Sequence, residues 1–167
     1  MLLQAPYSAS EITYIVSGGA LNSTHSLTHA GAIRSAGTPV TKEPVGLTRQ
    51  DGKRPDGLTL ISWQWGKPLT WDVTVVCTLA ASYLSYSAQS AGAEADLAVS
   101  SKEAKYMSLT NSYIFQPIAM ESHGAFSASA LSFLTTLGER LTGTSGDLRE
   151  MSYLFHSRSL YSVSIWS

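Results

Sequence analysis

Two stretches in the middle of the chain alternate apolar and polar side chains with a period of two, which is typical of β-strands. They run from Gly57 to Trp63 and from Leu69 to Cys77, and the Trp65-Gly66-Lys67-Pro68 segment between them suits a tight turn. We therefore predict a β-hairpin. If even positions pair with even positions, for example position 58 opposite position 72, Asp56 and Asp72 share one face of the hairpin. The opposite layer then receives the apolar side chains Trp71, Val73 and Val75.

The hydrophobic pattern elsewhere predicts helices and further strands around this hairpin. The predicted helices run from Asn22 to Ser35, Ala93 to Leu109, Phe126 to Leu141 and Asp147 to about Leu160, and the other strands from Thr38 to Glu43 and Tyr113 to Glu121. Pro117 places the last strand at an edge or a bulge, and Gly143 is expected to end the third helix. This order predicts an α/β fold with a mixed central sheet of about four strands flanked by helices.

The composition is that of one domain. The chain has 167 residues, 44% of them hydrophobic, so it can bury a core. We expect a poorly defined segment over residues 1–21, one domain over 22–160 and a tail over 161–167. A net charge of -1 gives no overall basic field, so nucleic-acid binding would need a local basic patch. No apolar run reaches the roughly 20 residues of a membrane-spanning helix, and we expect an intracellular protein without a membrane anchor.

Asp56 and Asp72 are unusual in strands that are otherwise apolar, because a carboxylate loses its hydration there unless something compensates its charge. Two acids brought together by neighbouring strands can bind divalent metal ions, which activate a water and neutralise a phosphodiester. Lys102 and Lys105 lie three residues apart on the predicted helix, with Tyr106 beside them, and either lysine could add positive charge. Each acid also has an ordinary explanation, as a turn residue or a solvent-facing residue, and helical lysines are often simply solvated. The residues alone leave both explanations open.

Other reactive residue types give weaker signals. The histidines lack the spacing of a zinc site with cysteine, and the single cysteine, which lacks a neighbouring base, is expected to be a buried structural thiol. The tryptophans of the hairpin are expected to fill or cover it, although an exposed Trp65 could stack on a base. The residues considered are His25, His29, His123, His156, Cys77, Trp63, Trp65 and Trp71.

Several motifs in a fixed order resemble a known family. They are Thr41-Lys42-Glu43-Pro44, Arg54-Pro55-Asp56-Gly57, Thr70-Trp71-Asp72-Val73-Thr74-Val75 and Lys102-x-x-Lys105-Tyr106. From about Ala32 to Phe155 the chain resembles the restriction-like endonuclease at the C-terminal end of reverse transcriptases from one group of non-LTR retrotransposons. That endonuclease belongs to the PD-(D/E)xK superfamily, in which the first acid follows a proline, the second lies in the next strand, and the lysine can move to a following helix.

This resemblance implies a restriction-endonuclease-like core with a catalytic site. In it, Asp56 and Asp72 bind Mg²⁺ or Mn²⁺, and Lys102 or Lys105, with Tyr106 close by, completes the site. The sequence does not choose between the two lysines, because one is adjacent to the tyrosine and the other is one helical turn away.

The implied function is that of a metal-dependent DNA endonuclease-like domain derived from a retrotransposon, as an isolated fragment whose activity can have been lost. Glu43 is an additional candidate acid, and Thr74 stands where many superfamily members carry the lysine. The implied partners are DNA and, originally, a reverse transcriptase domain of the same polyprotein, and a protein acting on DNA would be nuclear. The alternative is a non-catalytic α/β remnant that acts as a binding or interaction module, for which we expect an exposed Asp72 with no lysine ammonium nearby.

Overall fold

A mixed four-stranded sheet forms the centre of the protein. The computed structural model describes residues 29–77, 90–122 and 124–149. The strands within these residues are β1 (Val40–Lys42), β2 (Gly57–Thr59), β3 (Leu69–Val76) and β4 (Ile114–Glu121). Their order in the sheet is β1-β2-β3-β4, with β1, β2 and β3 antiparallel in turn and β4 parallel to β3. The predicted α/β class with a mixed sheet of about four strands is thereby confirmed.

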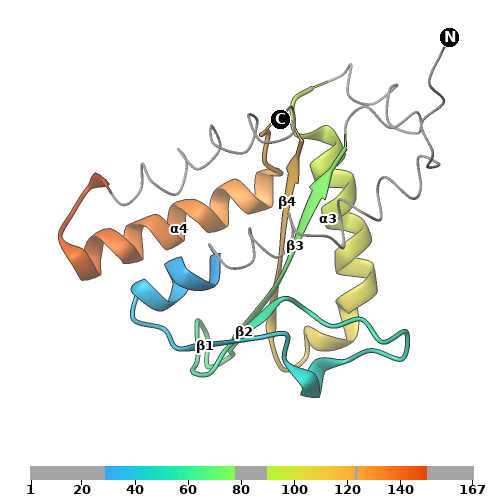
Figure 1. Cartoon of the computed structure of the whole chain (residues 1–167), viewed down its shortest axis with the longest axis horizontal. Helices are drawn as coiled ribbons and strands as arrows, with labels where there is room; N and C mark the ends of the chain where they lie inside the picture. The colour runs from blue at the N-terminus through green and yellow to red at the C-terminus, as the bar shows by residue number, and fades with distance from the viewer. Residues whose placement is uncertain (1–28, 78–89, 123, 150–167) are drawn as a thin grey trace, which may run out of the picture.

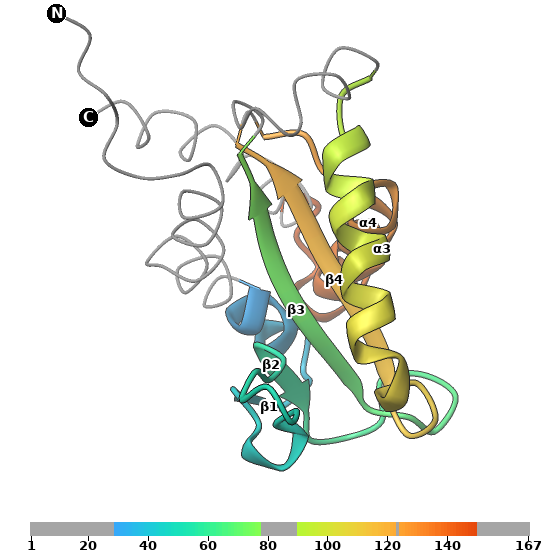
Figure 2. The same ribbon diagram turned by 90° about the vertical axis from the view of Figure 1, so that its right-hand side faces the viewer.

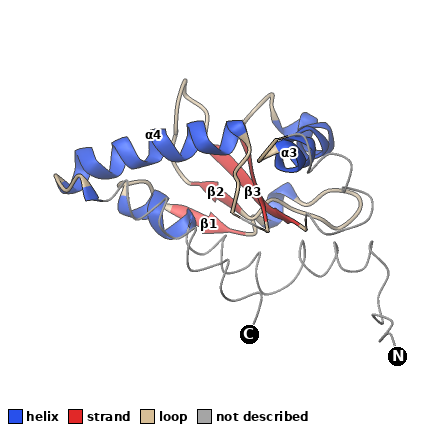
Figure 3. Ribbon diagram, turned by 90° about the horizontal axis from the view of Figure 1, so that it is seen from above, coloured by secondary structure: helices blue, strands red, loops and turns tan. Residues whose placement is uncertain are grey.

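Helices cover both faces of the sheet (Figures 1, 2 and 3). Helix α3 (Ala93–Tyr106), extended by the 3-10 turn η2 (Met107–Leu109), connects β3 to β4 on one face, and α4 (Ala128–Ser145) lies on the other. Because β3 and β4 are parallel, the chain must return to the same end of the sheet, and α3 makes this crossover. Residues 29–35 are also helical, and the short 3-10 turn η1 (Val45–Leu47) follows β1.

Alternation along β3 separates the main core from a more polar face. Asp72 and Thr74 lie on the side of α3, where Ala95 and Val99 form a small apolar cluster with Ala119 of β4. The alternate apolar side chains of β3 and β4 pack against α4 in the main core, which includes Trp71, Val73, Val75, Ile118, Met120, Phe133, Leu134 and Leu137. The two layers of the hairpin are therefore arranged as the sequence predicts.

The pairing of β2 with β3 confirms the predicted parity, although the predicted pair is wrong. Leu58 lies opposite Thr70, and the next pair is Gly57 with Trp71. Even positions therefore face even positions, as predicted. Position 58 pairs with position 70, however, which is two residues before the predicted partner at position 72. Asp56 directly precedes the first paired residue of β2, Gly57, and lies beside β3 close to Asp72.

Two predicted ends, those of β2 and α4, are wrong by four residues, each because a local hydrogen bond ends the element elsewhere. β2 stops at Thr59, whose hydroxyl accepts a hydrogen bond from Leu69 N–H and donates one to the Ile61 carbonyl, both at 2.8 Å. These bonds replace the next step of the ladder, so residues 60–63 leave the strand. α4 continues through Gly143 to Ser145. Its C-cap is Gly146, which has a φ of 73° and donates its N–H to the Thr142 carbonyl at 2.8 Å.

The remaining predicted elements are present where the structure describes them, with ends shifted by up to three residues. The first predicted helix is helical over residues 29–35, and the last lies outside the described residues except for 147–149. Trp63 and Trp71 are buried in the hairpin as expected. Trp65 is 82% exposed at the turn and does not fill the hairpin.

β4 lies at the end of the sheet, which confirms the edge position predicted from Pro117. The chain that follows β4 folds back along it. Glu121 N–H donates to the Ala125 carbonyl at 2.7 Å, and Ser127 N–H donates to the Ala119 carbonyl at 3.0 Å. The outer side of β4 thus donates one hydrogen bond to its own continuation and accepts one from it before α4 begins.

Candidate active site

Asp56 is held between two neighbouring strands. Its backbone N–H donates to the Trp71 carbonyl and its carbonyl accepts from Glu43 N–H, both at 2.9 Å. Its side-chain Oδ2 accepts from Val73 N–H at 2.7 Å. Pro55, directly before it, is fully buried and fixes the backbone on the entry side. The carboxylate is therefore fixed against β3 and cannot swing freely into solvent.

Asp72 lies in the middle of β3 and is 5% exposed. The Nζ atom of Lys102, from the third turn of α3, contacts Asp72 Oδ2 as an ion pair. A carboxylate in this position would otherwise lose its hydration without compensation, which costs several kcal/mol in a protein interior. The structure thus brings together Asp72 and one of the two lysines that the sequence offers.

Burial and mutual repulsion dominate the electrostatics of the two acids. Burial, followed by the charge of Asp72, raises the pKa of Asp56 from 3.8 to about 7, and the Val73 N–H and Lys102 oppose this increase. Burial also raises the pKa of Asp72, against the opposing charge and hydrogen bonding of Lys102. Asp56 is therefore partly protonated at neutral pH, and full ionisation of both acids needs more positive charge than Lys102 provides.

Lys105 and Tyr106 complete the α3 side of the site in different ways. Lys105 is mostly exposed. The remaining burial, followed by the nearby charges of Lys102, Lys53 and Arg49, lowers the pKa of its ammonium group. Tyr106 is buried, and burial followed by the charge of Asp72 raises the pKa of its hydroxyl. The two residues therefore lie within electrostatic range of the acids, although the direct contact to Asp72 comes from Lys102.

The aromatic ring of Tyr106 lies between two neighbours. Its centroid is 4.8 Å from that of Phe115 on β4, and the guanidinium carbon of Arg49 lies 5.3 Å from the centroid of the same ring. Arg49 and Lys53 belong to the loop between β1 and β2 and were missed as candidate functional residues by sequence reasoning. The dense run of basic residues around Asp51-Gly52 was the signal that could have identified this loop.

Glu43 does not contact Asp56 or Asp72 with its side chain. Its carboxylate pairs with Arg54, and its side chain is 63% exposed. Its backbone N–H, by contrast, supports the Asp56 carbonyl at 2.9 Å, and its charge makes a small contribution to the raised pKa of Asp56. The contribution of Glu43 to this site is mainly through its backbone.

Asp56 and Asp72 are carboxylates, the type of donor that hard divalent cations take. Mg²⁺ is commonly bound through one or two carboxylates, with waters and substrate phosphates as its other ligands. Among the described residues no group of three or more His, Cys, Asp or Glu side chains is placed to bind a metal. Burial raises the pKa of Asp56, and Asp72 is close enough for its charge to raise this pKa further. His29 is buried and Cys77 half-buried, while His25, His123 and His156 lie outside the described residues.

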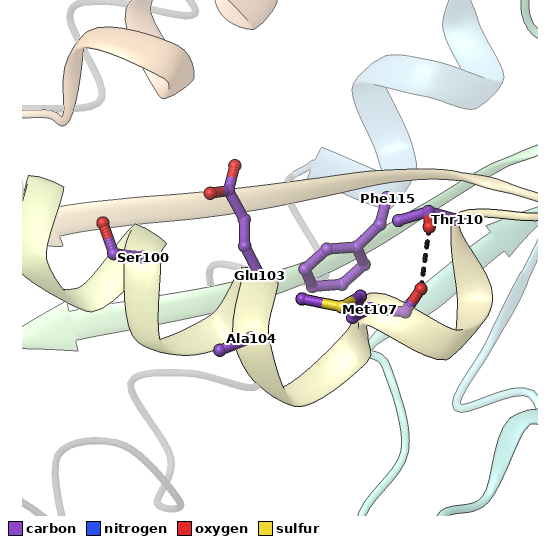
Figure 4. Close-up of a pocket in the computed structure, with 6 residues that line it drawn as sticks. All are labelled: Ser100, Glu103, Ala104, Met107, Thr110 and Phe115. Atoms are coloured by element: carbon purple, nitrogen blue, oxygen red, sulfur yellow. Dashed lines mark hydrogen bonds between the residues drawn. The ribbon is translucent and has the colours of Figure 1, made fainter.

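A cavity of about 400 Å³ lies on another face of α3, against the start of β4 (Figure 4). Helical spacing turns this face away from Lys102, because the lining positions 100, 103, 104 and 107 lie on the other side of the helix. The cavity is lined by Ser100, Glu103, Ala104, Met107, Thr110 and Phe115. It is therefore separate from the acid pair.

Comparison of the chain with known protein families and with curated protein sequences finds no match. None of the helices in the described part of the chain is long and apolar enough to cross a membrane.

Proposed function

We propose that this protein is a metal-dependent DNA endonuclease-like domain of the PD-(D/E)xK type, derived from a retrotransposon. The observation that carries the proposal is the contact of the Lys102 ammonium with buried Asp72, on the face of β3 beside Asp56. Nuclease chemistry on a phosphodiester needs acids that hold a divalent cation and a cation that offsets developing negative charge. These residue types converge here from three separate segments of the chain.

In this proposal each residue has a distinct role. Asp56 and Asp72 would hold Mg²⁺ or Mn²⁺, which when bound supplies Lewis-acid chemistry to a phosphodiester and its attacking water. Val73 N–H and the backbone around Asp56 keep that carboxylate directed along β3. Lys102 neutralises Asp72 in the free protein and would offset negative charge that develops on the phosphate.

The partners follow from the same proposal. The substrate is DNA, the original context is a polyprotein with a reverse transcriptase, and the site of action is the nucleus. The alternative of a non-catalytic binding module carries the expectation of an exposed Asp72 without a nearby lysine. Asp72 is instead 5% exposed and contacts Lys102, which favours the metal-site proposal over a solvent-facing acid.

A plasmid-nicking assay with Mg²⁺ or Mn²⁺ tests the proposal. We expect nicking by the wild-type chain and a loss of at least about a hundredfold in Asp72→Ala, in the range of losses for electrostatic groups at active sites. Asp147→Ala is the matched control, because Asp147 is an acid paired with Arg149 beyond the end of α4. Equal nicking by wild type and Asp72→Ala would refute the catalytic proposal.

Metal binding can be measured without activity. We expect Mg²⁺ to raise the melting temperature of the wild-type chain and of Asp147→Ala, but not of Asp56→Ala. The same increase in Asp56→Ala would place the ion elsewhere. Circular dichroism of each variant checks that the fold persists.

A further inference from the structure

A basic turn lies against α3 next to the two acids. Arg49 N–H donates to the Lys53 carbonyl at 2.8 Å, and Gly52 N–H donates to the Arg49 carbonyl at 3.0 Å. Asp51 Oδ1 accepts from Lys53 N–H at 3.1 Å, and Gly52 has a φ of 75°. These bonds close residues 49–53 into a tight turn that places Arg49 and Lys53 beside each other.

The turn is fixed to the helix that carries the lysines. The guanidinium carbon of Arg49 lies 5.3 Å from the centroid of the Tyr106 ring, which is a cation–π distance. Tyr106 adjoins Lys105 in the last turn of α3. The contact therefore holds the turn that carries Lys53 against the end of α3 that carries Lys105, and the charges of both lysines act on Asp72.

In the described part of the chain neither of these two lysines contacts a carboxylate directly, although the charges of both lower the pKa of Asp72. The nearby carboxylates have other partners, because Asp51 pairs with Arg49, Glu43 with Arg54, and Asp72 with Lys102. Within residues 29–77, 90–122 and 124–149, neither Lys53 nor Lys105 makes an ion pair. Burial, followed by the charges of Lys102, Lys53 and Arg49, lowers the pKa of Lys105, and the charge of Asp72 opposes this decrease. An anion bound between the two lysines would reduce the repulsion among these cations.

We infer that Lys53 and Lys105 form a phosphate-binding subsite for a DNA backbone phosphate next to the one at Asp56 and Asp72. Residues three apart on a helix lie on neighbouring positions of one face, about 4.5 Å apart along the helix axis. Lys102 at Asp72 and Lys105 at the basic turn can therefore serve successive phosphates. This inference rests on the proposed function, because it takes the polymer to be DNA.

Binding of a short labelled DNA duplex to the full chain, measured by fluorescence anisotropy in EDTA, tests this subsite without metal and without cleavage. We expect Lys53→Ala and Lys105→Ala each to reduce the slope of log affinity against log salt by about 1, and the double variant by about 2. Lys53→Arg and Lys105→Arg should keep the wild-type slope, because a guanidinium also binds phosphate. Arg149→Ala is the control, since it removes one positive charge beyond the end of α4.

The outcomes separate this inference from the proposed function. An unchanged salt slope in the double variant, with a wild-type melting curve, overturns the subsite, and so does a wild-type chain without measurable DNA binding at low salt. Nicking that depends on Asp72 together with an unchanged slope supports the endonuclease and refutes the subsite. A reduced slope in the double variant without any nicking by wild type supports the subsite and refutes the endonuclease.

Discussion

Replacement of Asp56 by asparagine tests whether the acid pair carries an electrostatic cost in the folded protein. The pKa of Asp56 rises from 3.8 to about 7 because the carboxylate is buried and lies near the charge of Asp72. Between these two pH values the folded state binds more protons than the unfolded state. The free energy of unfolding therefore decreases as pH rises through this window, and the stabilisation is fully present only below the lower value.

The size of this effect follows from the same two values. A change from 3.8 to about 7 corresponds to about 4 kcal/mol of lost stability once Asp56 is ionised. Asparagine keeps an oxygen that can accept from Val73 N–H, as Asp56 Oδ2 does at 2.7 Å, but it carries no charge. We therefore expect Asp56→Asn to be more stable than wild type above about pH 7, by up to about 4 kcal/mol, and similar to wild type near pH 4.

Urea unfolding across this pH range measures the difference. Asp147→Asn is the control, because Asp147 is a solvent-exposed acid whose pKa is lowered by its hydrogen bonds with Arg149. Its replacement should not produce a stability gain at high pH. Parallel stability curves for wild type and Asp56→Asn, or a wild-type stability that rises from about pH 4 to about pH 7, would refute the reasoning.

Three further substitutions test the packing around the site. Gly57→Ala places a Cβ 2.0 Å from Trp71 Cζ2, so we expect a loss of about 3 kcal/mol in urea unfolding, and an unchanged midpoint would contradict this packing. Lys102→Met leaves buried Asp72 without its cation, so we expect the free energy of unfolding to fall by about 3 kcal/mol at neutral pH. This loss should shrink in acid, when Asp72 is protonated. A loss that does not depend on pH would argue against the ion pair. Ser127→Ala removes the N-cap of α4, where Oγ accepts from Ala130 N–H at 3.2 Å, and should lower the free energy of unfolding by about 1 kcal/mol. An unchanged thermal midpoint in Ser127→Ala would indicate that packing alone, and not the Ser127 cap, stabilises the start of α4.

Much of the fold was predictable because local patterns and packing agree. Alternation in β3 and the turn residues after Trp63 determine which face receives Asp72, and helical spacing identified α3 and α4. The exact pair across β2 and β3 was not predictable. It depends on the Thr59 hydroxyl, which replaces one step of the ladder with side-chain hydrogen bonds, and propensity does not report such a bond.

The candidate site was predictable only in part. The acids stood out as costly residues in apolar strands, whereas the choice of Lys102 over Lys105 depends on how α3 is rotated against β3. Arg49 and Lys53 were missed because their relation to α3 depends on a contact with Tyr106, which is far away in sequence. Contacts of this kind are set by tertiary packing, which the local sequence does not encode.

The position of Pro117 in β4 affects how this protein behaves at high concentration. An exposed strand edge is a template on which another chain can add a strand and begin to aggregate. Proline has no N–H to offer such a chain, and the bonds from Ser127 N–H to Ala119 and from Glu121 N–H to Ala125 already use nearby groups of β4. The end of the sheet nearest the crossover helix is thus protected against intermolecular strand addition, which favours colloidal stability for a sheet of so few strands.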